Sequence, residues 1–149
     1  MGMLNLDTPV GRMYLSSDGE NITELKFGSC GEELPDAVIM KAKIELEEYF
    51  AGRRKSFSVP IKPRGTDFQQ KVWAALRDIP YGETASYGEI AGQIGNPKAC
   101  RAVGMANNRN PIAIIIPCHR VIGAGGALTG YAGGLDKKEF LLNFEAQRR

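Results

Sequence analysis

A change of pattern at residues 62–65 constrains the fold of this chain more than any other sequence feature. Before it, short β-like runs alternate with turn signals such as Asp18-Gly19-Glu20-Asn21. After it, apolar residues recur at helical spacing behind helix-capping sequences. The prolines and charges of Lys62-Pro63-Arg64-Gly65 therefore predict a linker between a supporting domain at residues 1–61 and a second domain at residues 66–149.

The part before the linker is predicted to form a small antiparallel sheet with one helix. The helix begins at Pro35-Asp36 and runs to about Ala51, because Gly52 and a basic cluster follow there. The expected strands cover residues 3–6, 12–17, 22–27 and 57–61.

The part after the linker is predicted to be mostly helical. Capping boxes at Thr66 and Ser86 each begin a helix. Gly95 ends the second of these, and Asn96-Pro97 begins another that runs to about Ala106. Two short helices joined by a tight glycine turn predict a winged-helix-like helix-turn-helix. The predicted fold class is α/β of the α+β type.

The composition indicates a globular protein and argues against a membrane, exported or metal-binding one. A chain of 149 residues with 43% hydrophobic and 24% charged residues is typical of one globular domain or two small ones. We expect no membrane span, because the longest aliphatic run is 112–116, and no export signal at the N-terminus. The three cysteines have no paired spacing, and with one histidine they predict no metal site and a cytoplasmic protein.

The charge is uneven, with a net −3 over residues 1–60 and +5 over residues 61–149. Such an excess is usually a solvated face. Small side chains dominate the helix predicted at 97–106, and this indicates close packing against another helix as readily as a DNA contact. Arg101, with Lys98 and Arg109 nearby, shifts the interpretation toward DNA.

Reactive side chains follow the apolar run at 112–116, which is predicted to be a strand. They stand in Pro117-Cys118-His119-Arg120-Val121. A neighbouring imidazole and guanidinium are the groups that lower the pKa of a thiol, so Cys118 is a candidate nucleophile. The alternative is an inert buried cysteine. Because adjacent side chains on a strand point to opposite faces, a water between Cys118 and His119 is expected rather than direct contact.

A glycine-rich stretch then presents Tyr131, ahead of a helix expected at 135–145. The ring would either stack on a planar ligand or pack in the interior.

Together these motifs resemble the O6-alkylguanine-DNA alkyltransferases. The resemblance rests on Asn96-Pro97-Lys98-Ala99, Arg101-Ala102-Val103-Gly104, Asn110-Pro111, the cysteine motif at 117–121 and Gly130-Tyr131-Ala132-Gly133-Gly134-Leu135. It covers about Thr66 to Glu145 in register and, more loosely, the N-terminal part with Thr8-Pro9-Val10-Gly11.

The resemblance implies DNA repair by direct reversal, through irreversible stoichiometric transfer of an alkyl (methyl) group to Cys118 without a cofactor. His119 is implied to deprotonate Cys118 through a water, and Glu145 to orient His119. Tyr87 is implied to donate to guanine N3.

It also implies a partner, double-stranded DNA containing O6-alkylguanine, bound by a monomer through the minor groove with the damaged base flipped out. Arg101 would enter the duplex, flanked by Lys98, Arg109 and the small residues Ala99, Ala102 and Ala106. The flipped base would be held by Asn110, Val121, Tyr131, Ala132, Gly133 and Lys138.

Two departures and three alternatives accompany this prediction. Some members have Ser where this chain has Ala132, and some bind zinc through N-terminal ligands that this chain lacks. A non-catalytic damage sensor of the same architecture would have its cysteine replaced, whereas Cys118 is present. A cysteine hydrolase would turn over repeatedly, and a transcription regulator would need a dimer.

Overall fold

The computed structural model describes residues 1–149 and divides into two compact units. The first unit holds residues 1–64 together with 111–115, and the second holds 65–110 together with 116–149. The segment 111–115, expected within the C-terminal part, therefore belongs to the first unit.

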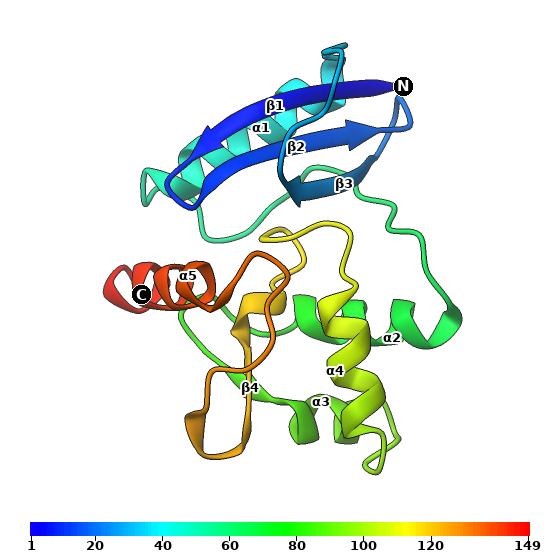
Figure 1. Ribbon diagram of the computed structural model, residues 1–149, viewed down its shortest axis with the longest axis vertical. Coiled ribbons are helices and arrows are strands. Elements are labelled where there is room, and N and C mark those ends of the chain that lie inside the picture. The colour runs from blue at the N-terminus through cyan, green and yellow to red at the C-terminus, as the bar shows by residue number, and fades with distance from the viewer. The chain divides into compact units, whose positions relative to one another are not determined.

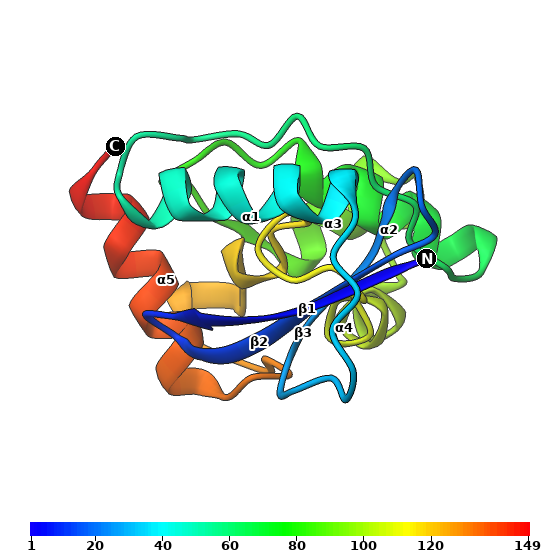
Figure 2. The ribbon, with the colours of Figure 1, turned by 90° about the horizontal axis from the view of Figure 1, so that it is seen from above.

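The first unit is a three-stranded antiparallel meander with one helix. Its strands β1 (Gly2–Thr8), β2 (Gly11–Ser17) and β3 (Ile22–Phe27) lie in the order β1-β2-β3, as expected. Helix α1 (Ala37–Phe50) begins at the cap Asp36 and packs along the sheet, as Figures 1 and 2 show. The most deeply buried apolar side chains of this unit are Met13, Leu15, Ile22, Leu25, Ile39, Ala42, Tyr49 and Ile112.

The strand predicted at 57–61 is wrong. Only Ile61 forms a β-bridge, to Ile22. The buried carboxylate of Glu45 on α1 instead accepts hydrogen bonds from the backbone N–H groups of Ser58, at 2.9 Å, and Val59, at 3.1 Å. These donors are taken by a helix side chain, so the segment cannot use them to extend a sheet.

The strand predicted at 112–116 is also wrong, although the segment is buried. The first residues of the segment form backbone hydrogen bonds with Leu25 of β3. Leu25 N donates to Pro111 O at 2.9 Å, and Ala113 N donates to Leu25 O at 3.0 Å. The chain then turns, with Ile114 in the left-handed region at φ 70°. A β-branched residue rarely adopts that conformation, so tertiary contacts override its strand propensity here.

The second unit is mostly helical. Its helices are α2 (Asp67–Arg77), α3 (Tyr87–Gln93), α4 (Cys100–Asn108) and α5 (Leu135–Gln147). Strand β4 (Ala85–Ser86) pairs in parallel with β5 (Val121–Ile122), and two short 3₁₀ turns cover Cys118–Arg120 and Ala124–Gly126. Both predicted capping boxes, at Thr66 and Ser86, are confirmed. No helix of the chain is long and apolar enough to cross a bilayer.

Helix α4 begins later than predicted, at Cys100 rather than after Asn96. Asn96 is used by the preceding helix: Gly95, at φ 81°, ends α3 and Asn96 N donates to Ala91 O at 2.9 Å. This is the Schellman arrangement of a helix C-terminus. Ala99 N then donates to Asn96 O at 3.0 Å and closes a turn, so α4 begins only after that turn, with Ala99 as its N-cap. On its inner side α4 contacts α2, where Trp73 Nε1 donates to Ala106 O at 2.9 Å.

Candidate functional site

Cys118 begins a buried 3₁₀ turn rather than ending a strand. Its side chain is only 6% exposed. The amides of two asparagines hold the turn, because Asn110 Nδ2 donates to Ile116 O at 2.8 Å and Asn107 Nδ2 donates to Cys118 O at 3.4 Å. Both asparagines come from the end of α4 and the residues just after it, so this helix positions the thiol.

The surroundings of Cys118 differ from the sequence prediction. Burial raises the pKa of the thiol to about 11, against which a hydrogen bond from Asn110 and the charge of Lys138 act in the lowering direction. His119 and Arg120 are not among the groups that lower it. The prediction that these neighbours lower the thiol pKa is therefore wrong, because both side chains bond to Glu145 instead.

His119 and Glu145, predicted to pair, lie together: His119 Nε2 is 2.8 Å from Glu145 Oε2 and both side chains are buried. Burial alone would raise the pKa of Glu145, but hydrogen bonds from His119 and Arg120 outweigh it and lower that pKa. Burial lowers the pKa of His119. A neutral His119 facing an ionised carboxylate carries its proton on Nε2, which leaves Nδ1 as an acceptor with no protein partner.

Arg120 is the member of this network that sequence reasoning missed as a partner of Glu145. Its Nε and Nη2 bond the two carboxylate oxygens, and its Nη1 donates to Ile79 O at 2.8 Å, just beyond the end of α2. The cysteine motif contains this arginine, but only the fold brings Glu145 and Ile79 to it.

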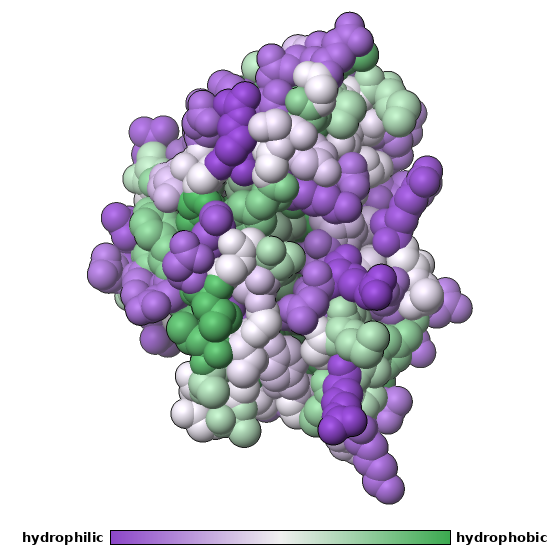
Figure 3. Space-filling view, in the orientation of Figure 1, coloured by the Kyte–Doolittle hydropathy of each residue, from purple (hydrophilic) through white to green (hydrophobic).

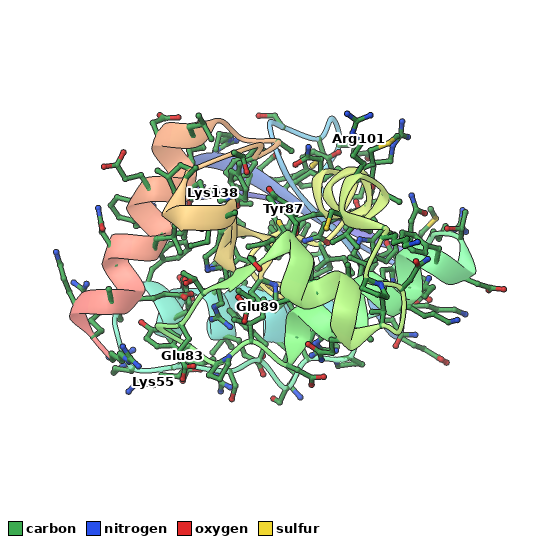
Figure 4. All side chains as sticks on the ribbon, turned by 90° about the horizontal axis from the view of Figure 1, so that it is seen from below. Lys55, Glu83, Tyr87, Glu89, Arg101 and Lys138 are labelled. Carbon is green, nitrogen blue, oxygen red and sulfur yellow. The ribbon has the colours of Figure 1, made fainter.

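Tyr87 and Lys138 are also brought together, around a residue that was not predicted. The Tyr87 hydroxyl donates to Thr129 O at 3.3 Å and accepts from Thr129 Oγ1 at 3.0 Å. Lys138 Nζ donates to the same carbonyl at 2.6 Å. Figure 4 labels Tyr87 on α3 and Lys138 on α5, the two helices that Thr129 links through these contacts.

The remaining predicted base-contacting residues lie in β5 and the loop before α5. Val121 is buried in β5, where it pairs with Ala85. Tyr131 is 9% exposed, and burial raises its pKa well above the ordinary value. Next to it, Ala132 is exposed and Gly133 is half-buried.

The predicted DNA-contacting residues lie on and around α4, and all but one of them are exposed or half-buried. Lys98, Arg101, Ala102 and Arg109 are exposed and Ala99 is half-buried, and Arg101 projects outward in Figure 4. Ala106 is 2% exposed, so its predicted place on this surface is wrong. Over α4 in Figure 3, hydrophilic atoms alternate with mildly hydrophobic ones instead of forming an apolar patch.

Comparison with known families accounts for almost the whole chain. Residues 5–63 match the ribonuclease-like domain of 6-O-methylguanine DNA methyltransferase, and residues 67–147 match its DNA binding domain. The chain belongs to this methyltransferase family. The predicted resemblance and the α+β fold are thereby confirmed.

Individual relatives agree with the family assignment. The methylated-DNA–protein-cysteine methyltransferase of Methanosarcina acetivorans is 57% identical over 147 residues, covering 93% of this chain and 94% of that protein. The protein of the same name from Haemophilus influenzae is 50% identical, covering 93% and 82%. The crystal structure of Mycobacterium tuberculosis OGT in complex with DNA has a TM-score of 0.92 at 49% identity, covering 99% of this chain and 94% of that one.

Proposed function

We propose that this protein repairs DNA by transferring an alkyl group, typically methyl, from O6 of guanine to the sulfur of Cys118. Family membership supports the reaction, and one observation supports the residue. Cys118 is the buried cysteine whose neighbour His119 pairs with an ionised carboxylate, whereas Cys30 is half-buried and Cys100 is exposed.

The first step is removal of the thiol proton. His119 Nδ1 is an acceptor without a protein partner, and a bridging water would carry the proton to it from Cys118. Glu145 holds the ring through Nε2 and stabilises the imidazolium that forms. Asn110 and Lys138 stabilise the thiolate, which offsets part of the cost of burying it.

The second step is a single in-line displacement. The thiolate electron pair forms the sulfur–carbon bond while the bond between the alkyl carbon and O6 breaks. Guanine keeps that electron pair and takes a proton from Tyr87 at N3. The thioether product resists hydrolysis, so each molecule acts once, irreversibly and without a cofactor.

The base would be recognised by the residues around Cys118. The Val121 carbonyl would accept from the exocyclic amine and the Ala132 N–H would donate to O6. Tyr131 and Gly133 would flank the ring. Ala132 supplies no side-chain hydroxyl, so only its backbone acts there.

DNA would be bound as a duplex by a monomer, through the minor groove. Arg101 and Ala102 on the exposed side of α4, next to Lys98 and Arg109, support this placement, because small and cationic side chains suit a narrow anionic groove. A stacked base cannot present its O6 substituent to a buried thiol, so the damaged nucleotide would be flipped out and Arg101 would take its place.

Intact mass measured with a duplex containing one O6-methylguanine tests the proposal. We expect a gain of one methyl group, confined to the Cys118 peptide, saturating at one equivalent and absent in Cys118→Ala. Tight binding without a change in mass would indicate a damage sensor. Repeated turnover of an ester or amide at Cys118 would indicate a hydrolase.

A further inference from the structure

We propose that Thr129 is a positioning residue that prepares Tyr87 to give its proton to the departing guanine. This inference rests on the proposed function, because it concerns the acid of that reaction. Thr129 lies in the loop before α5 and is exposed, yet it forms hydrogen bonds with two residues of the site, Tyr87 and Lys138.

The backbone carbonyl and the side-chain hydroxyl of Thr129 make opposite hydrogen bonds with the Tyr87 hydroxyl: one accepts and the other donates. The backbone carbonyl accepts its proton at 3.3 Å, a long and easily exchanged hydrogen bond. The side-chain hydroxyl donates to its oxygen at 3.0 Å. Tyr87 can therefore turn its proton away from Thr129 and toward a base while its oxygen still receives the hydroxyl of Thr129.

Lys138 lowers the free-energy cost of turning the Tyr87 proton away from the Thr129 carbonyl. Its buried ammonium donates to the Thr129 carbonyl at 2.6 Å, so the carbonyl keeps a partner after Tyr87 turns away. A carbonyl left without a donor would oppose the movement. The loop also stays in place, because the contact with Lys138 does not involve the side chain of Thr129.

The hydroxyl of Thr129 acts when the proton leaves. Negative charge then builds on the Tyr87 oxygen, and a hydrogen bond to a charged acceptor is roughly twice as strong as one between neutral groups. The contact is thus stronger in the transition state than in the free protein, which is the condition for raising the rate rather than the affinity.

Single-turnover transfer at saturating duplex tests this role with matched variants. Thr129→Val keeps the shape and the backbone carbonyl but loses the hydroxyl, and Thr129→Ser keeps the hydroxyl. We expect Thr129→Val to be about 10-fold slower than wild type and Thr129→Ser to stay near the wild-type rate. Thermal stability and duplex affinity should be unchanged in both.

A second duplex separates positioning from a merely structural effect. O6-methyl-3-deazaguanine has carbon in place of N3, so it cannot accept the proton of Tyr87. On it, Thr129→Val should match wild type, and in a Tyr87→Phe background the same substitution should add nothing. Equal slowing on both duplexes, or a Ser variant as slow as the Val variant, would overturn the role of Thr129.

The failure of this inference differs from failure of the proposed function. Wild-type transfer with a Thr129→Val variant that is equally fast overturns only the inference. Full-rate transfer by Tyr87→Phe overturns Tyr87 as the acid, and Thr129 with it. A wild-type protein that takes no methyl group from either duplex overturns the proposed function.

Discussion

The guanidinium of Arg120 grips the carboxylate of Glu145 through two hydrogen bonds, Nε to Oε1 at 2.8 Å and Nη2 to Oε2 at 2.9 Å. Both side chains are buried, and the third guanidinium contact, to Ile79 O, reaches the residues after α2. Oε2 of Glu145 also forms a hydrogen bond with His119 Nε2, at 2.8 Å. One ion pair therefore ties α5, the cysteine motif and the end of α2 together and fixes the partner of His119.

Replacement of Arg120 should be costly for folding. Arg120→Met leaves the buried Glu145 carboxylate without its cation, although His119 and, at 3.5 Å, Gly82 N still contact it, and removing one member of a buried pair costs about 3–5 kcal/mol. Arg120→Lys keeps the charge but not the two-point contact, so it should fall between Met and wild type. Urea unfolding measures both. Arg12→Met is the control, because its pair with Asp7 at 2.9 Å is exposed and should contribute about 1 kcal/mol or less.

Stability should fall as the pH drops below about 6.5, the ordinary pKa of histidine. Burial lowers the pKa of His119 in the folded protein, so the unfolded chain takes up the proton first and folding loses free energy as the pH falls. The chain has one histidine, so the decline between about pH 6.5 and 5.5 belongs to His119. Below about 5.5 the carboxylates whose pKa is lowered in the folded protein, Asp18, Asp36, Glu45 and Glu145, add to it.

Urea midpoints of wild type and His119→Gln over pH 4.5–8 measure this decline. The midpoint of the variant should be flat between about pH 6.5 and 5.5 and should fall only below that range, where the carboxylates take up protons. A wild-type midpoint that stays constant or rises across that window would contradict the lowered pKa of His119.

The features of this fold that the sequence predicted correctly depend on residues that are close together in the chain. The capping boxes at Thr66 and Ser86 depend on residues three apart, and the hairpins of the meander depend on nearby turns. Predictions failed where a distant group competed. Glu45 accepts from the backbone N–H groups of Ser58 and Val59, a turn through Ile114 at φ 70° interrupts residues 112–116, and the end of α3 uses the backbone N–H of Asn96.

In the candidate site, too, motifs along the chain were predictable and contacts between distant residues were not. Cys118, His119 and Glu145 were identified because their motif and its distance to α5 resemble a family pattern. Arg120 as a partner of Glu145 and Thr129 as a partner of Tyr87 were missed, since no local spacing indicates which distant elements they meet. The direction of the Cys118 pKa was missed because burial, which sequence neighbours do not reveal, outweighs charge.

The thiol of Cys118 should react slowly with iodoacetamide in DNA-free protein. Burial raises its pKa to about 11, so the thiolate fraction and the rate should grow about tenfold per pH unit from 7 to 10 without levelling off. Mass spectrometry of the Cys118 peptide follows the reaction, and circular dichroism at each pH confirms that the protein is folded. Exposed Cys100 should be modified first at neutral pH.

The variant Asn110→Ala tests one cause of the pH dependence of Cys118 alkylation. Its amide acts to lower the pKa of Cys118, so the variant should react more slowly than wild type at each pH, provided that circular dichroism is unchanged. A rate that levels off below pH 9 in wild type would contradict the raised pKa.

Affinity for undamaged duplex should fall with salt, and the cations beside α4 should set the slope. Lys98→Met and Arg109→Met should each reduce the slope of log K against log salt by about 1, with similar loss on every sequence. Fluorescence anisotropy between about 50 and 200 mM salt measures this. Lys71→Met, an exposed cation on α2, is the control and should leave the slope unchanged.

Bulk added to the exposed side of α4 should weaken DNA binding without weakening the fold. Ala102→Leu adds a branched side chain where the helix would approach the groove most closely, and a helix surface held off by one such side chain loses the contacts of its neighbours. The loss should be about tenfold in affinity. Ala74→Leu makes the same change at an exposed position of α2 and should bind DNA like wild type. If Ala102→Leu also bound like wild type, α4 would not be the element that enters the groove, and Arg101 could not replace the flipped base.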